Sequence, residues 1–193
     1  MEFLSSEYWN TRYEEKDTGW DLNEVSPPIK NYIDQLTIDV TSKILIPGCG
    51  SAHEATYLIS KGFTNIHILD FAQDPLNKFK LKHPYFPTSH LHGEDFFIHN
   101  GKYDLIIEQT LFCAIDPNSR TLYAKKCSDL LNEGGRLVGL LFNRSFPAGP
   151  PFGGSRDEYF QYFSSYFSEI YMEPCFNSIA PRSGTELFIK MKK

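Results

Sequence analysis

Paired cysteines are missing from this sequence. The four cysteines stand at positions 49, 113, 127 and 175, with no CxxC pair and no histidine at ligand spacing beside them. This arrangement excludes a zinc ribbon and a disulfide framework, and isolated cysteines of this kind are typical of small buried apolar residues. We therefore predict no metal site and no disulfide.

Long apolar runs are also missing. No stretch approaches the roughly 18–20 residues of a membrane span, and the first residues, Met-Glu-Phe-Leu-Ser-Ser-Glu, lack the basic and apolar regions of a signal peptide. At 193 residues with 41% hydrophobic content, the chain is long enough to bury one good core. We expect a single cytoplasmic domain over residues 1–193, in which residues 1–42 form an N-terminal arm.

Positive charge is scarce. Lysine and arginine number 19 against 24 for aspartate and glutamate, so the net charge is −5, and no basic stripe offsets this balance. We therefore expect neither a nucleic-acid partner nor a membrane partner. The composition favours a small-molecule substrate and leaves open whether the chain is a monomer or a homodimer.

What the chain does have is a βαβ unit over residues 43–70. An apolar run at 44–46 enters a turn with Gly48 and Gly50, a helical pattern follows, and a second apolar run ends on Asp70. The glycines let a ligand lie against the backbone, and a carboxylate about 20 residues further on can accept both ribose hydroxyls of an adenosine. The unit predicts a nucleoside-cofactor site, with a tight turn of an unrelated α/β protein as the alternative.

The third glycine of the dinucleotide fingerprint is absent. Residues 51–54, Ser-Ala-His-Glu, take its place, and Glu54 in the first helical turn would oppose a pyrophosphate. S-adenosylmethionine carries no phosphate, so this turn favours it over NAD. A nicotinamide-dependent oxidoreductase and a non-catalytic cofactor-binding module stay open as alternatives.

Strands and helices alternate from residue 43 to residue 142. We expect strands near 44–46, 66–70, 88–91, 103–108, 136–142, 170–176 and 186–191, and helices from about 28, over 75–82, from 116 to about 131 and over 157–167. A short turn at 181–184 joins the last two strands and makes them antiparallel. The pattern predicts an α/β fold with a doubly wound, mostly parallel seven-stranded sheet and one antiparallel edge strand.

Aromatic residues crowd the N-terminal arm. Tyr8, Trp9, Tyr13 and Trp20 are interleaved with charged residues, and both tryptophans of the protein lie here. One hypothesis is that the rings staple the arm to the core. The other is that the arm is a lid, whose rings cover a bound cofactor and attract a sulfonium cation.

Two further candidate cofactor contacts follow the third expected strand. In an open α/β sheet this loop reaches the crevice beyond the strand ends, where Asp95 can accept the adenine amino group and Phe96 can cover the base. The alternative is a polar turn followed by a core phenylalanine.

Together these residues resemble the thiopurine S-methyltransferase superfamily, most closely its thiol and halide methyltransferase branch. The resemblance runs nearly end to end and implies a class I, Rossmann-like enzyme that uses S-adenosylmethionine and releases S-adenosylhomocysteine. Its specific motifs are Tyr8-Trp9 with Arg12-Tyr13, Gly19-Trp20-Asp21, Ile46-Pro47-Gly48-Cys49-Gly50, Asp70, Glu94-Asp95-Phe96-Phe97, Tyr103-Asp104-Leu105-Ile106, Leu111-Phe112-Cys113-Ala114-Ile115 with Arg120, Gly149-Pro150-Pro151-Phe152 and Arg182-Ser183-Gly184.

The resemblance also implies roles for particular residues. The family's cofactor contacts fall on Trp9, Tyr13, Trp20, Gly48, Gly50, Asp70, Asp95, Phe96, Gln109 and Arg120, and its substrate side falls on Trp20, Phe152 and Arg182. Two positions depart from the family, since Tyr13 is often tryptophan in relatives and the halide branch carries tyrosine at the position of Phe152. The missing hydroxyl removes a donor to an anion, which disfavours halide methylation.

No catalytic residue is assigned from the sequence. Methyl transfer from a sulfonium needs positioning and exclusion of water, and an acidic thiol arrives partly ionised without a dedicated base. Glu108 and His53 are the nearest candidates for a base, Cys49 and Cys113 for a nucleophile, and we interpret all four as structural. We expect methylation of a small nucleophile, preferably the sulfur of a thiol, with halides, thiocyanate and thiopurines as alternatives.

Overall fold

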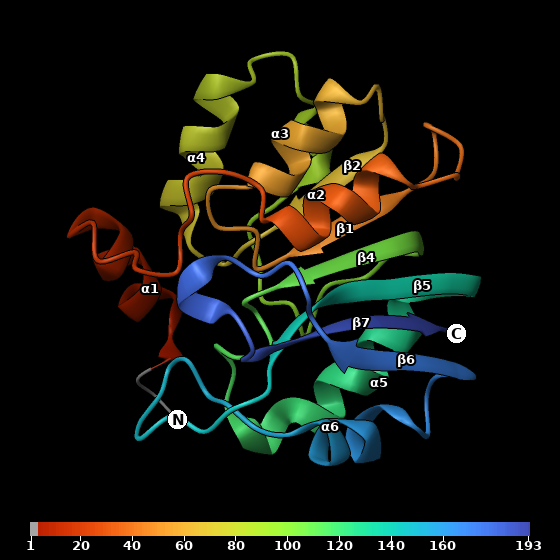
Figure 1. Cartoon of the computed structure of the whole chain (residues 1–193). Coiled ribbons are helices and arrows are strands. Elements are labelled where there is room, and N and C mark those ends of the chain that lie inside the picture. Colours follow the sequence, from red (N-terminus) through yellow and green to blue (C-terminus); the bar gives the residue numbers. More distant parts are fainter. Residues whose placement is uncertain (1–3) are drawn as a thin grey trace.

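The structure is a computed structural model, and it describes residues 4–193. One seven-stranded sheet runs through it, with helices on both faces (Figure 1). The strands are β1 (Ile44–Pro47), β2 (Ile66–Leu69), β3 (Leu91–His92), β4 (Tyr103–Gln109), β5 (Leu131–Phe142), β6 (Glu169–Pro174) and β7 (Glu186–Lys192). The helices are α1 (Ser6–Glu14), α2 (Pro27–Asp34), α3 (His53–Ser60), α4 (Gln73–Lys82), α5 (Arg120–Leu130) and α6 (Arg156–Phe163).

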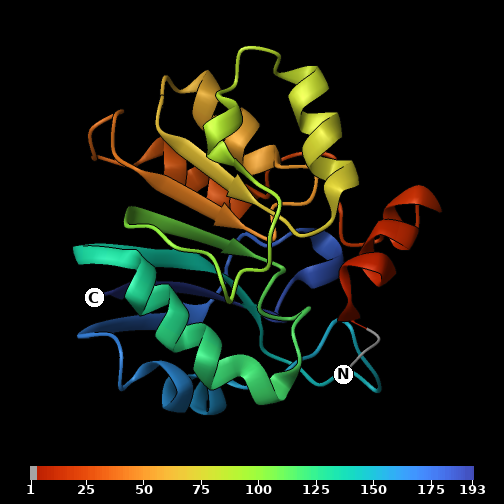
Figure 2. The same cartoon turned by 180° about the vertical axis from the view of Figure 1, so that it is seen from behind.

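Two hydrophobic cores sandwich the sheet because successive strand residues point to opposite faces. In β1, Ile44 and Ile46 pack with α2, α3 and α4, whereas Leu45 packs on the other face with α5 and α6. The views from the two sides show α3 and α4 above the sheet and α5 and α6 below it (Figures 1 and 2). Strands buried on both faces are apolar throughout, as β1 and β2 are.

The strand order is β3-β2-β1-β4-β5-β7-β6. Strands β1 to β5 are parallel, and β7 runs antiparallel to both β5 and β6. The chain moves outward from β1 to β3 and then returns to β4 on the other side of β1, so the order reverses between β1 and β4. In such sheets the ligand crevice lies at this reversal, outside the carboxyl ends of the strands.

The predicted fold class is confirmed, with the reversed strand β7 one place in from the sheet edge. Local differences have physical causes. Residues 88–90 form a 3-10 turn rather than strand, and only residues 91–92 pair with β2. The carbonyl of Ile66 in β2 is hydrogen-bonded to Nδ1 of the His90 ring at 3.0 Å, and not to the backbone of residues 88–90. The C-terminal helix ends at Phe163, four residues earlier than expected.

The helix expected from 116 to about 131 is shorter. Residues 117–119 form a 3-10 turn and α5 ends at Leu130, because Leu131 pairs with Tyr103 and starts β5. The sequence pattern predicts Leu122, Ala124 and Leu130 on the apolar face of this helix; Ala124 and Leu130 are buried, whereas Leu122 is 52% exposed and Tyr123 is buried. None of the helices within residues 4–193 has the length and apolar character needed to cross a bilayer.

Candidate active site

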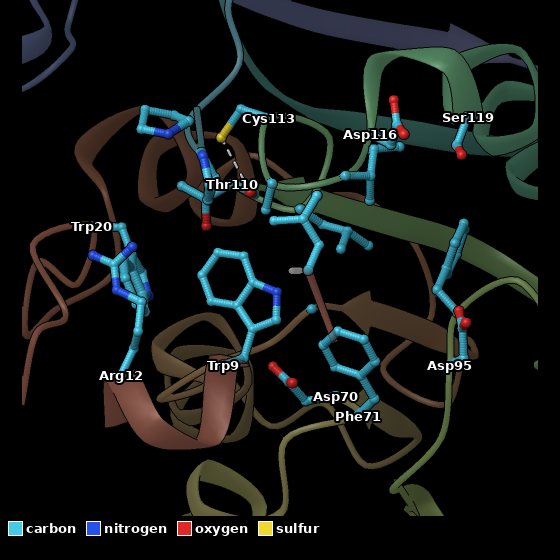
Figure 3. A pocket seen from close by; sticks show the side chains of 18 of the residues that line it. Trp9, Arg12, Trp20, Asp70, Phe71, Asp95, Thr110, Cys113, Asp116 and Ser119 are labelled. Atoms are coloured by element: carbon cyan, nitrogen blue, oxygen red, sulfur yellow. Dashed lines mark hydrogen bonds between the residues drawn. The ribbon is translucent and has the colours of Figure 1, made fainter. Parts of the chain in front are cut away.

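A cavity of about 540 Å³ lies at the carboxyl ends of the parallel strands (Figure 3). Each of these strands contributes the residues that follow or end it, and the N-terminal arm closes the opposite side. The lining comprises Leu4, Trp9, Arg12, Tyr13, Gly19, Trp20, Gly48, Leu69, Asp70, Phe71, Glu94, Asp95, Phe96, Phe97, Thr110, Leu111, Cys113, Ala114, Ile115, Asp116, Ser119, Phe142, Pro150, Pro151 and Arg182. Of the candidate residues, it unites Trp9, Tyr13, Trp20, Gly48, Asp70, Asp95, Phe96 and Arg182.

Asp70 follows β2 and is held by backbone groups. Its Oδ2 accepts from Gly50 N at 3.0 Å and its Oδ1 accepts from Ala72 N at 2.9 Å. Burial raises the pKa of the carboxyl above its ordinary value, and the backbone N–H groups oppose this rise. Each carboxylate oxygen keeps acceptor capacity beyond its one backbone bond, so the fixed group can receive hydroxyl donors from the cavity.

The glycine turn lets the arm touch the backbone. Gly48 and Gly50 have φ of +59° and +48°, which side chains rarely adopt. A Cβ at Gly50 would lie 2.8 Å from the Tyr13 hydroxyl, and one at Gly48 would lie 2.9 Å from the Leu111 side chain. Glycine is therefore required at Gly50 by the close approach of the arm, and at Gly48 by the close approach of the segment after β4.

The rings of the arm form one cluster at the cavity wall. Trp20 packs edge-on against Trp9 with ring centroids 5.3 Å apart and against Tyr13 at 5.7 Å. The guanidinium of Arg12 lies 4.7 Å from the Trp20 ring centroid, a cation–π contact. Figure 3 shows the Trp9 ring projecting over Asp70 and Phe71.

Polar contacts tie the arm to the core at separated points. Asp21 accepts from His53 Nε2 at 2.7 Å and from the Ser51 hydroxyl. The hydrogen bond from His53 lowers the pKa of Asp21, and the same hydrogen bond to Asp21 raises the pKa of His53. Arg182 Nη2 donates to the Trp20 carbonyl at 2.9 Å. These contacts connect the described part of the arm to α3 and to the turn before β7.

The loop after β3 supplies another wall of the cavity. Asp95 accepts from Phe97 N at 2.8 Å and is otherwise exposed, while Phe96 is buried against the Tyr123 ring at 5.1 Å. Both residues line the cavity. Phe96 is therefore a core residue that also borders the cavity, and its contact with the adenine base stays a prediction.

Much of the remaining lining is apolar. It includes Ala114, Ile115, Phe142, Pro150 and Pro151, with Asp116 and Ser119 as polar neighbours in the chain. Arg182 is a cation in this lining, and its guanidinium carbon lies 5.7 Å from the Phe142 ring centroid, with Nη1 3.6 Å from Glu186. This part of the lining suits a small, weakly hydrated group that carries negative charge.

Thr110 marks the start of the segment that crosses the cavity after β4. Its φ is +71°, an outlier for a β-branched residue. Its carbonyl accepts from the Cys113 thiol at 3.1 Å (Figure 3). Such strain persists only where the surroundings fix it, and it concentrates at ligand sites.

Four candidate residues do not line this cavity, judged on the described residues. Gly50 and Gln109 border a neighbouring cavity of about 40 Å³ together with Glu54, and Gln109 accepts from Ser26 at 2.6 Å. Arg120 is 1% exposed and does not border this cavity. The ring of Phe152 packs against Gly149, and the two prolines before it form the wall instead.

Arg120 positions the Gly-Pro-Pro loop. Its Nη1 donates to Gly153 O at 2.9 Å and to Glu158 at 3.1 Å, and its Nη2 donates to Phe152 O at 3.0 Å. Its guanidinium also lies 4.8 Å from the Phe112 ring centroid. The residue therefore acts through the loop that carries Pro150 and Pro151.

The candidate bases and nucleophiles are structural in this arrangement. Glu108 is fully buried, accepts from Phe112 N at 3.0 Å and from the Tyr123 hydroxyl, and burial raises its pKa to about 7. Burial raises the pKa of the Cys113 thiol to about 12 and that of Cys49 well above its ordinary value. Neither thiol is a ready nucleophile near neutral pH.

Sequence reasoning missed several lining residues. Phe71 follows Asp70 directly, and Arg12 stands between two aromatic residues of the arm, so adjacency to predicted contacts was the available signal. Asp116 and Ser119 also line the cavity, and they belong to the turn before α5. No pattern in the sequence marked that turn as part of the site.

Comparison with known proteins identifies the family. The family model described as Thiopurine S-methyltransferase (TPMT) matches residues 4–179. A probable thiol methyltransferase 2 of Arabidopsis thaliana is 30% identical, covering 98% of this chain and 86% of that protein. Thiocyanate methyltransferase 1 of Brassica oleracea is 28% identical, covering 96% and 84%, and a thiopurine S-methyltransferase of Vibrio parahaemolyticus is 26% identical, covering 83% and 82%.

Solved structures share the fold at low sequence identity. A 1,6-didemethyltoxoflavin-N1-methyltransferase of Burkholderia thailandensis with bound S-adenosylhomocysteine is 12% identical, with a TM-score of 0.73 over 98% of this chain and 87% of that chain. A TehB-like methyltransferase of Corynebacterium glutamicum is 18% identical, with a TM-score of 0.65 over 97% and 98%. The family match and the similarity to the thiol methyltransferase carry the conclusion that the chain belongs to the thiopurine S-methyltransferase family and is an S-adenosylmethionine-dependent methyltransferase.

Proposed function

We propose that this enzyme binds S-adenosylmethionine at the Asp70 end of the cavity and methylates the sulfur of a small thiol at the Arg182 end. The observation that carries the proposal is that one cavity is lined both by Asp70, a carboxylate fixed by backbone N–H groups, and by Arg182, a cation against the apolar ring of Phe142. Relatives named for thiol and thiocyanate methylation support a small sulfur nucleophile.

The residues at the first end fit the cofactor. Asp70 would accept the ribose hydroxyls, Asp95 the adenine amino group, and the ring of Phe96 would lie against the base. Glu54 is buried beside the glycine turn, and burial raises the pKa of its carboxyl. A phosphate there would meet a carboxyl group rather than a cation, which supports a cofactor without phosphate. When bound, S-adenosylmethionine supplies a methyl group activated by a sulfonium.

The residues at the second end would hold the acceptor. Arg182 attracts and orients an anion, and the surrounding apolar walls exclude water from it. Of the described residues, no histidine or lysine lines the cavity, and Glu108 is fully buried outside its lining. An acceptor that arrives ionised, as an acidic thiol or hydrosulfide partly does at neutral pH, needs no base from the enzyme. Apolar walls penalise a compact, strongly hydrated halide more than a soft thiolate.

We also propose that the N-terminal arm works as a lid within a single domain. It borders the cavity through Trp9 and Trp20, and separate hydrogen bonds at Asn10, Trp20 and Asp21 connect it to the core. Opening them would admit a cofactor, and closing them would exclude water during transfer. The four unpaired cysteines fit a reducing, cytoplasmic setting.

The proposal is tested by identifying the product. The purified enzyme is incubated with isotope-labelled S-adenosylmethionine and, separately, a small thiol, hydrosulfide, thiocyanate, iodide and a thiopurine. The label should appear in a methyl thioether or methanethiol with the highest kcat/KM, together with stoichiometric S-adenosylhomocysteine. Faster labelling of iodide, thiocyanate or the thiopurine would reassign the acceptor, and no labelling with any nucleophile would refute the assignment of a small anionic acceptor.

A further inference from the structure

Four histidines gather at the β3 edge of the sheet, beside the cofactor wall. This histidine cluster consists of His67 in β2, His90 before β3, His92 in β3 and His99 after it. The ring of His67 stacks on His90 with centroids 4.0 Å apart and on His92 at 5.2 Å, and His92 lies 4.6 Å from His99. The methyltransferase reaction proposed above uses none of these rings.

Hydrogen bonds select the tautomer of His92. Nε2 of His67 lies 3.2 Å from Asn65 Oδ1, an acceptor, so neutral His67 carries its proton on Nε2. Nδ1 of His67 is then an acceptor, and it faces Nε2 of His92 at 2.9 Å. His92 must therefore donate through Nε2, which leaves its Nδ1 without a proton and able to bind a cation.

His99 can also bind a cation through a ring nitrogen. It is buried, its Nδ1 lies 2.6 Å from Glu94 Oε1, and its Nε2 lies 2.7 Å from the Tyr103 hydroxyl. A cation that replaces the proton between Nδ1 and Glu94 moves that proton to Nε2, where the Tyr103 oxygen accepts it. The proton count of the ring is unchanged, and its orientation stays fixed by Tyr103, as metal-binding histidines require.

We propose that His92, Glu94 and His99 form a binding site for a divalent transition-metal ion, with Zn²⁺ as the preferred occupant. One ligand atom from each residue lies within 4.8 Å of the others. Ligands of a tetrahedral zinc, each about 2.1 Å from the ion, lie about 3.4 Å apart, so small side-chain rotations complete the site. Two imidazoles and one carboxylate form a set that suits zinc, with water in the fourth position.

The ion would fix the loop that carries the cofactor wall. His92 and His99 stand at the two ends of the 92–99 segment, and Glu94 within it lines the cavity together with Asp95, Phe96 and Phe97. Of the three ligands, Glu94 is the accessible one, with its side chain 38% exposed. The site is therefore structural in character, and it acts on the segment rather than on the reacting atoms.

Calorimetric titration of the tag-free, EDTA-treated full chain with ZnCl₂ tests the site. We expect one Zn²⁺ per chain, and binding at least about ten-fold weaker in Glu94→Gln and in His92→Gln, since even partners of a metal ligand are worth that much. His83→Gln, which removes a histidine at the end of α4, should bind zinc like the wild type. Equal binding by all four proteins, or no binding by the wild type, would overturn the proposal.

Hydrogen exchange locates the ion independently of activity. Saturating Zn²⁺ should slow amide exchange in residues 92–99 of the wild type and raise its melting temperature, because a ligand of the folded state alone stabilises it. In Glu94→Gln both effects should be lost. Slowing that is confined to another segment would place the ion elsewhere and contradict the assignment.

Discussion

Asp21 and His53 join the N-terminal arm to the first turn of α3, with Oδ1 of Asp21 2.7 Å from Nε2 of His53. Trp20, the ring at the centre of the aromatic cluster, is the preceding residue. The arm therefore lies on the core through a contact whose charge depends on pH.

The first prediction concerns the pH dependence of the arm. The pKa of His53 is raised above 6.5 by Asp21, so the stability it contributes is fully present below pH 6.5 and is lost as pH rises through the raised pKa. The pKa of Asp21 is lowered from 3.8, so its contribution is present above that pH and is lost as pH falls through the lowered value. The ion pair should hold best between these limits.

Tryptophan fluorescence measures this effect. The wild type should show a transition above pH 6.5 as Trp20 loosens, and Asp21→Asn should abolish it. His83→Gln serves as the matched control and should keep the transition. If Asp21→Asn titrates like the wild type, the ion pair does not hold the arm.

The second prediction concerns Asp70. Asp70→Ala removes the acceptor of two ribose hydroxyls, at a cost of roughly 1–3 kcal/mol, so affinity for S-adenosylhomocysteine should fall about ten- to a hundred-fold. Asp129→Asn, which alters an exposed carboxylate on α5, is the control and should bind normally. Calorimetry decides the matter, and an unchanged affinity in Asp70→Ala would remove that residue from the cofactor site.

The third prediction separates steric from conformational effects at Gly50. Gly50→Ala and Gly62→Ala both place a side chain at positive φ, +48° and +88°, but only the first meets the Tyr13 hydroxyl, since nothing lies within 4 Å of a Cβ at Gly62. Gly62→Ala should lose about 1 kcal/mol of unfolding free energy, and Gly50→Ala should lose more, because its Cβ also meets the Tyr13 hydroxyl. Only Gly50→Ala should also speed amide exchange in residues 6–20.

A second substitution checks the cause. Adding Tyr13→Phe to Gly50→Ala removes the hydroxyl that the new Cβ would meet, and should restore slow exchange in the arm. Persistent fast exchange in the double variant would show that the backbone of the turn, and not the contact with Tyr13, governs arm docking.

The fourth prediction concerns Arg182 and Phe152. Arg182→Gln removes a charged donor worth roughly 1.5–3 kcal/mol, so kcat/KM for a thiol should fall about ten- to a hundred-fold. Glu186→Gln, which removes the neighbouring carboxylate and keeps the arginine, should have a smaller effect.

Phe152→Tyr should change the ratio of halide to thiol rates by less than about three-fold, because the ring packs on Gly149. A large change in that ratio would show that the ring reaches the acceptor.

Much of the fold and part of the site followed from local pattern. The βαβ unit fixed Gly48, Gly50 and Asp70 because a glycine turn and a strand-end carboxylate are local features, and their common edge follows from parallel pairing. Arg120 was not predictable in the same way. Its partners are carbonyls of residues 152 and 153, and pairing over such a separation leaves no periodic signal. The direction of the Phe152 ring likewise depends on loop geometry that the Gly-Pro-Pro motif does not encode.

The central claim is that a thiol is the preferred acceptor, and a competition measures this directly. The enzyme is given S-adenosylmethionine with equal concentrations of a small acidic thiol and chloride, and the two methylated products are quantified at low conversion, so that their ratio equals the ratio of the kcat/KM values. We expect the methyl thioether to exceed methyl chloride by more than about ten-fold, because apolar walls penalise the compact, strongly hydrated halide more than the soft thiolate. Methyl chloride in equal or greater amount would contradict this claim.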